Sequence, residues 1–259
     1  YPALTFLLVL LMSCEATETI NINGGSGGQG QTYNSFVSRY WYSSDLDMAV
    51  KVSDSMDALL TNGDFDGSGN SIYEQMMIKW EDATPGVTLF NIADHTTTNK
   101  DNGNLSSYYD NEIGIYKSDN WFADVSSDAL AITQYYVYQK NVGQASEHQQ
   151  IVHADIIVNF RDHGFTLVEN EDNNYDLPTV ILHELGHLIG MKHQSNWIIN
   201  AVMNPSLAKS EDKRSVYPDD QARVQELYPS NAFASSFAKS AAISTDEGYQ
   251  DENNEDKTL

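Results

Sequence analysis

The sequence predicts an α+β domain with a mixed sheet, and three observations lead to this class. Four segments are rich in β-branched and aromatic residues and are separated by Asn, Asp and Gly clusters: residues 87–92, 112–116, 130–138 and 152–160. Apolar residues at Ile72, Met76 and Trp80 recur at a helical spacing. Helix signals return at Leu177-Pro178 and over residues 219–227. With a further strand over residues 48–52, these elements assemble most simply as a sheet backed by two long helices.

Composition limits the function classes. The chain has 259 residues, 41% of them hydrophobic, which is enough to bury a substantial core. Its 14 basic and 37 acidic side chains give a formal net charge of -23, which repels the phosphate backbone of nucleic acids. We therefore expect no nucleic-acid partner.

The first residues have the features of an export signal. Residues 6–11 are continuously apolar, too short to span a bilayer as a helix, and suited to the centre of a signal peptide over residues 1–13. Residues 11–14 resemble a bacterial lipobox, in which Cys14, the single cysteine of the chain, would carry lipid. We expect a protein anchored by lipid at the outer membrane or surface of a bacterium, with plain secretion as the alternative.

Composition also divides the rest of the chain. A Gly- and Ser-rich tether follows Cys14, so residues 14–34 are expected to form a lipidated linker. Residues 231–259 are acidic and poor in apolar side chains, which predicts a disordered tail. The folded domain is therefore expected over residues 35–230.

One segment carries the chemistry. His183 and His187 lie four residues apart directly after an apolar run, so on a buried helix they project from one face and can bind one ion. Glu184 lies beside them as a candidate general base for metal-activated water. Gly190 can end the helix in a left-handed conformation and bring His193 back as third ligand. Three neutral imidazoles suit one catalytic Zn²⁺ and leave a coordination position open.

A buried histidine on an apolar helix is ordinarily a core side chain that has found a hydrogen-bond partner. Here three of the seven histidines, one glutamate and one glycine all occur at the offsets that a zinc site needs. The metal-binding interpretation therefore outweighs the structural one.

The string from His183 to His193 resembles the long zinc signature of the metzincin metallopeptidases at every fixed position. The resemblance implies a methionine in a tight turn beneath the zinc, and Met203 stands ten residues beyond His193. It also implies a twisted, mixed five-stranded sheet with an active-site helix, a backing helix and a C-terminal helix.

Within the metzincins the chain looks most like the matrixins, the matrix metalloproteinase type, over roughly residues 41–228. The segments that carry this likeness are residues 80–85, 201–205 and 219–228. The resemblance implies that Pro205 lines the pocket for the residue after the scissile bond. It also implies that Leu130, Ala131 and the next two residues form the edge strand that pairs with substrate.

The chain departs from the matrixin pattern in several places. Matrixins usually have tyrosine where Asn204 stands and another aromatic residue at Leu207, which alters the expected specificity pocket. Their inhibitory cysteine has no counterpart other than Cys14, so latency through a cysteine is not expected. Their structural zinc site uses a His-x-Asp pair, and among His95, His148, His153 and His163 only His153 is followed two residues later by aspartate, Asp155. A single such pair does not make a zinc site, and we predict no second zinc.

Residues 62–70 offer oxygen side chains at alternate positions before a glycine, like the start of a Ca²⁺ loop. The twelfth position from Asn62 is Tyr73 instead of glutamate, and Glu74 misses it by one residue. A polar turn that caps the following helix is the simpler interpretation, and calcium remains an alternative.

Together these features predict a zinc endopeptidase that hydrolyses peptide bonds in protein or peptide substrates. The alternative is a non-catalytic surface lipoprotein that uses a metzincin fold for adhesion or partner binding. The intact Glu184 favours the enzyme, because a degenerate member would be expected to lose its base or a ligand first. The sequence leaves the oligomeric state open.

Overall fold

A computed structural model describes residues 38–60, 67–92 and 99–230, together with the backbone of three short strands before and between these ranges. The strands are β1 (Phe6–Leu11), β2 (Thr19–Ile22), β3 (Ser38–Tyr40), β4 (Val50–Ser53), β5 (Thr96–Thr97), β6 (Ile113–Ser118), β7 (Ala131–Lys140), β8 (His148–Asn159), β9 (Phe165–Thr166) and β10 (Tyr175–Asp176). The helices are α1 (Asp54–Leu60), α2 (Ile72–Ala83), α3 (Leu177–Leu188) and α4 (Pro218–Leu227), with 3₁₀ turns η1 (Ser43–Asp45) and η2 (Leu105–Tyr108).

A mixed sheet forms the centre of the domain. Its strand order is β2-β1-β7-β8-β6-β4-β5, and β3 pairs with the first part of β8. The strands β5, β4, β6 and β8 run parallel, whereas β7 is antiparallel to β8. The α+β class and the mixed sheet are confirmed, and in the described part of the chain the short strands β1, β2 and β3 enlarge the expected five-stranded sheet to eight strands.

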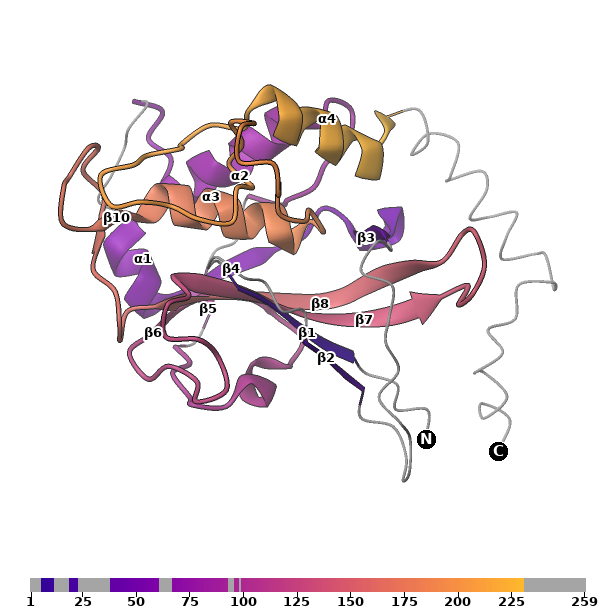
Figure 1. Ribbon diagram of the computed structural model, residues 1–259, viewed down its shortest axis with the longest axis horizontal. Coiled ribbons are helices and arrows are strands. Elements are labelled where there is room, and N and C mark those ends of the chain that lie inside the picture. The colour runs from indigo at the N-terminus through magenta and orange to yellow at the C-terminus, as the bar shows by residue number, and fades with distance from the viewer. Residues whose placement is uncertain are drawn as a thin grey trace.

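All four α-helices lie on one face of this sheet (Figure 1). The helix α3 packs directly against β7 and β8 of the sheet and against α2. Helix α4 lies on the same face of the sheet, and the twelve residues of α3 are all buried. The opposite face carries a second, smaller apolar cluster that includes Tyr108, Trp121 and Ile157. Because both faces of the sheet are covered, side chains on both sides of the central strands are buried, and the sequences of these strands are continuous apolar runs.

The backing helix α2 is joined to α3 by a close approach. Trp80 is fully buried, and its indole Nε1 donates a hydrogen bond to the carbonyl of Leu182 at 2.9 Å. A Cβ added at Gly186 would lie 2.7 Å from Trp80 Cζ2 and 2.4 Å from Met203 Sδ. Glycine is therefore required at this position of α3 because the helices meet there.

The predicted strand over residues 87–92 is wrong. Only an isolated bridge between Met48 and Phe90 forms in that segment. The carboxylate of Glu81 accepts hydrogen bonds from the backbone amides of Leu89 and Phe90, so a helix side chain takes donors that a neighbouring strand would need. Strand β5 pairs with β4 in its place, and the seven-residue helix α1 was not anticipated.

The other predicted elements are confirmed with shifts of a few residues at their ends: β4, α2, β6, β7, β8, α3 and α4. Cys14 and the tail over residues 231–259 lie outside the described residues, as does the predicted linker over residues 14–34 except for strand β2 (Thr19–Ile22), which was expected to be part of a flexible tether. Within the described part, no helix is both long enough and apolar enough to cross a bilayer.

We expect Gly186→Ala to lower the free energy of unfolding by about 1–3 kcal/mol, because the added methyl group overpacks the contact between α2, α3 and Met203. Urea denaturation of the purified protein measures the change. Gly103→Ala is the matched control, since its Cβ would meet only Asn120 at 3.5 Å. Equal stability of the two variants would contradict this account.

Candidate metal centre

The helix α3 begins at a reinforced cap. The Asp176 side chain accepts a hydrogen bond from the Thr179 backbone amide at 3.0 Å, and Pro178 occupies the first turn, where its missing N–H costs nothing. Arg214 pairs with the same carboxylate and fixes it in place. These contacts supply hydrogen-bond and ion-pair partners at the first turn of α3, which is almost fully buried.

The other end of α3 leaves carbonyl groups without helical partners, and three distant side chains supply donors. Trp41 donates to the carbonyl of Leu188 at 2.7 Å, Tyr135 donates to that of His187, and Tyr228 donates to that of Ile189 at 2.8 Å. All three donors are buried, so each replaces water that cannot reach these groups.

Gly190 then turns the chain away from the helix axis. Its φ of 92° lies in the left-handed region, and a Cβ there would lie 2.2 Å from the Arg39 carbonyl oxygen. Both the backbone conformation and the close approach require glycine. The predicted role of Gly190 in ending the helix matches this geometry.

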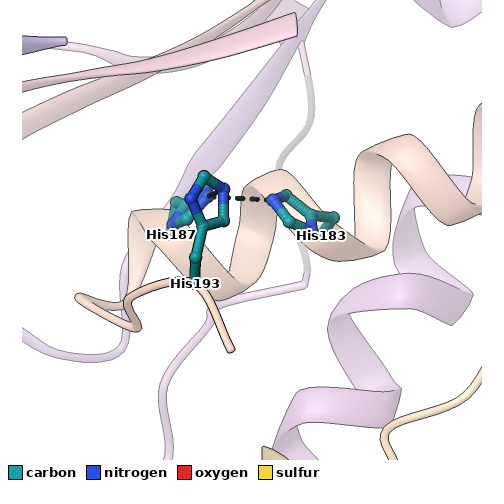
Figure 2. A group of neighbouring side chains, drawn as sticks. All are labelled: His183, His187 and His193. Atoms are coloured by element: carbon teal, nitrogen blue, oxygen red, sulfur yellow. Dashed lines mark hydrogen bonds between the residues drawn. The ribbon is translucent and has the colours of Figure 1, made fainter. Parts of the chain in front are cut away.

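The turn brings three imidazoles together, as Figure 2 shows. The distance between Nε2 of His183 and Nε2 of His187 is 2.9 Å, and Nε2 of His187 lies 3.1 Å from Nε2 of His193. The candidate ligand atoms of all three residues lie within 4.8 Å of one another. This is the spacing that three ligands of a single ion need.

Hydrogen bonds identify which ring nitrogens carry protons. Nδ1 of His183 lies 2.7 Å from the carbonyl of Val202, and Nδ1 of His187 lies 2.8 Å from that of Met191. A carbonyl can only accept, so both Nδ1 atoms are donors, and in the neutral rings the Nε2 lone pairs point at one another. Converging lone pairs repel unless a cation lies between them, so this donor set fits Zn²⁺.

Burial keeps the rings neutral. Desolvation holds the pKa of His183 and of His187 well below the usual histidine value, and neighbouring imidazoles add to this effect. Desolvation, followed by the charge of Arg223, lowers the pKa of His193 to about 4. Neutral imidazole is the form that binds a metal, so the protein prepares the ligands for binding.

Glu184 is completely buried beside the ligands but does not belong to the three-histidine group. Its Oε2 accepts a hydrogen bond from the Thr133 hydroxyl at 2.6 Å, whereas its Oε1 has no hydrogen-bond partner. Burial raises the pKa of this carboxyl to about 8. One oxygen is thus held by Thr133, and the other is buried without a hydrogen-bond partner.

A carboxylate on α4 holds the turn beneath the histidines. Asp220 is buried and accepts hydrogen bonds from the backbone amides of Val202 at 2.7 Å and Met203 at 3.2 Å. The Val202 carbonyl in turn orients His183, so α4 supports the metal centre through this turn. Met203 is fully buried against Gly186 of α3.

The departures near the turn now have a physical account. Asn204 is almost buried; its Oδ1 accepts from the Ala201 amide at 3.2 Å, and its Nδ2 donates to the Ile199 carbonyl at 3.1 Å. This side chain therefore holds the preceding loop. Leu207 belongs to the main core, and Pro205 is half-buried between the two.

Leu130 and Ala131 are buried at the start of β7, next to α3. The prediction that β7 is the edge strand needs correction, because β1 pairs with its outer side in antiparallel register from Leu11 opposite Ile132 to Phe6 opposite Val137. The sequence offered no signal for this pairing, since the apolar run of β1 has no alternating pattern.

The predicted calcium loop lies mostly outside the described residues. The structure resumes at residue 67, and α2 is capped by Ser71 and Glu74, which follow the predicted turn: Glu74 accepts a hydrogen bond from the Ser71 amide at 2.5 Å. Throughout the described residues, the three histidines are the one group of three or more ligating side chains close enough to share an ion.

Fold and site together define a domain built around a histidine triad for one metal ion, with a buried carboxylate alongside. The sequence model of the matrixin family matches residues 61–229, so the chain belongs to the matrixin family. Family membership implies zinc and supports a metallopeptidase.

Curated relatives agree over a short stretch. The chain is 38% identical to Metalloendoproteinase 5-MMP of Arabidopsis thaliana over 56 residues, and 37% identical to Metalloendoproteinase 1 of Glycine max over 57 residues. Each match covers 22% of this chain, but only 15% and 18% of the two relatives.

We expect His187→Ala to weaken Zn²⁺ binding by more than about 100-fold, because loss of a ligand should exceed the 10- to 100-fold effect of losing a supporting group. Competition with a chromophoric chelator measures the affinity. His163→Ala, which alters a histidine outside the triad, should bind zinc like the parent chain. Unchanged affinity in His187→Ala would contradict the assignment.

Proposed function

We propose that this protein is a zinc endopeptidase that hydrolyses peptide bonds in protein substrates. One observation carries the proposal: a buried carboxylate oxygen of Glu184 has no hydrogen-bond partner beside three imidazoles whose Nε2 atoms converge. Leaving such an oxygen unpartnered costs free energy in a merely structural site, whereas a general base requires it.

His183, His187 and His193 would hold the ion. A bound Zn²⁺ would supply Lewis-acid polarisation of the scissile carbonyl and acidification of a water molecule. Glu184 would take a proton from that water through Oε1 and pass it to the nitrogen of the leaving amine. The Thr133 hydroxyl would keep the carboxylate turned toward the reacting atoms by holding Oε2.

An extended peptide would bind along β7. Backbone pairing with a strand supplies affinity without reading the sequence of the substrate, and side-chain pockets then supply specificity. We propose that Leu130 and Ala131 contribute to this strand and that Pro205 lines the pocket after the scissile bond. The register of β1 supports the proposal because it shows that the outer side of β7 accepts an antiparallel strand.

The alternative is a surface protein that uses the matrixin fold for adhesion or partner binding. Retention of all three histidines, the carboxylate and the donor that orients it favours the enzyme. A binding protein has no need for the unpartnered oxygen of Glu184.

We further propose export, with a signal over residues 1–13 and a lipid on Cys14 that attaches the protein to a bacterial membrane. The apolar run followed by a lipobox-like cysteine supports this proposal. Mass spectrometry of the membrane fraction would detect the lipid on Cys14, and an unmodified secreted chain would refute the anchor.

We expect Glu184→Ala to reduce kcat for casein hydrolysis by about 10²- to 10⁴-fold, which is the range for loss of a general base. Zinc affinity should remain within a few-fold of the parent value, because Glu184 is not a ligand. Release of soluble peptides measures turnover, and chelator competition measures the metal.

Asp172→Ala serves as the control for Glu184→Ala, since it removes an exposed carboxylate outside the proposed metal-binding and substrate-binding residues. Activity of the parent chain should disappear with a chelator and return with Zn²⁺. Full activity of Glu184→Ala would refute its role, and absence of hydrolysis under every condition would favour the binding protein.

We expect a chain of residues 14–259, which removal of the proposed signal would leave, to have a KM for extended peptides about tenfold below that of the unprocessed full chain, because in the unprocessed chain β1 competes for β7 at an effective concentration in the millimolar range. Steady-state kinetics measure this. Leu8→Pro in the full chain should have the same effect, since proline disrupts strand pairing. Equal KM values for all three chains would show that β1 does not occlude β7.

A further inference from the structure

We propose that Trp197 and Ile198 form an apolar subsite for a substrate side chain on the N-terminal side of the scissile bond. These residues lie in the loop over residues 194–200, which joins His193 to the turn at Met203. The inference rests on the proposed function and specifies which peptides the site prefers.

The two side chains are displayed to solvent. Trp197 is 85% exposed and Ile198 is 75% exposed, the highest values among the large apolar residues in the described part of the chain. In the free protein these two side chains leave a large apolar area in contact with water, which is unfavourable. We take this small apolar patch as the place where an apolar side chain of a partner packs.

The loop backbone is held in place by hydrogen bonds. The Gln194 amide donates to the Met203 carbonyl at 2.7 Å, and the Gln194 side chain donates to Asp219 at 2.7 Å. At the tip, the Ile198 amide donates to Asn196 Oδ1 at 3.2 Å. The exposed pair is therefore presented by a structured turn, and the entropy cost of ordering it on binding is reduced.

The side of the scissile bond follows from the direction of α3. Along β7, Thr133 contacts Glu184 and Tyr135 contacts His187, so α3 and β7 advance in the same direction. A peptide antiparallel to β7 therefore has its N-terminal part toward the end of α3, as β1 shows with Phe6 opposite Val137. The loop that follows His193 leaves from this same end.

The partner is a peptide with an apolar side chain. The loop is continuous with the metal centre, since His193 precedes it and the Val202 carbonyl that orients His183 follows it. The loop therefore starts and ends at the metal centre, and it leaves from the end of α3 where the N-terminal part of a substrate would lie. The net charge of -23 also disfavours an anionic membrane surface as the partner.

Fluorescence tests the contact without turnover. The chain has four tryptophans, and Trp41, Trp80 and Trp121 are buried, so changes in exposed-tryptophan emission report on Trp197. In zinc-loaded Glu184→Ala, a peptide with leucine on the N-terminal side of the bond should shift the emission to shorter wavelength and reduce acrylamide quenching. The same peptide with serine at those positions should leave both unchanged.

Cleavage of a peptide library tests specificity in the active full-length chain. We expect the parent to favour apolar residues on the N-terminal side, and Trp197→Ser with Ile198→Ser to lower kcat/KM for the leucine peptide about tenfold. The serine peptide should change little. The matched control is Val142→Ser with Val168→Ser, two exposed apolar residues in other loops, which should keep the parent profile.

Each other outcome overturns the subsite. An unchanged profile in the Trp197 and Ile198 variant, with activity retained, removes this inference alone. Loss of binding to phosphatidylcholine vesicles with an unchanged profile assigns the pair to a membrane, and loss of a dimer in gel filtration assigns it to a second copy. A parent chain that cleaves no peptide overturns the proposed function as well.

Discussion

The metal centre depends on how the buried end of one helix is satisfied. The carbonyl groups that α3 leaves free cannot reach water, and side chains from β7 and from segments at both ends of the domain donate to them. The position of His187 is therefore fixed by Tyr135 as well as by the helix itself. Because the helix end is fixed and Gly190 sets the direction of the chain after it, the position of His193 is fixed as well. Because these buried carbonyl groups need hydrogen-bond donors, the side chains that supply the donors also fix the positions of the histidine ligands.

The supporting groups form a layer around these ligands. Asp220 holds the turn whose carbonyl orients His183, and Thr133 holds the carboxylate of Glu184. Neither is a candidate ligand, yet Asp220 holds the turn that orients His183, and Thr133 holds the carboxyl group beside the three histidines. Asp220 lies on α4 and Thr133 lies on β7, so the last helix and the sheet both contribute groups that support the site (Figure 1).

Local patterns allowed the group of three histidines, the neighbouring Glu184 and the helix end to be predicted from sequence, because helical periodicity and a glycine turn act over a few residues. Thr133 could not be predicted, since it lies 51 residues from Glu184 and its role exists only once β7 packs on α3. The strand expected at residues 87–92 failed for a similar reason, because the Glu81 side chain takes its amides. The pairing of β1 with β7 also depends on long-range register instead of local propensity.

The backbone carbonyls that orient His183 and His187 have a consequence for stability. The carbonyls of Val202 and Met191 belong to the chain segment that a bound ion would hold in place. Ordering of this segment and correct placement of the histidine ligands are therefore expected to occur together. By thermodynamic linkage, resistance to heat becomes a function of the free zinc concentration around the protein. An environment poor in zinc would then leave the chain inactive and also more readily degraded.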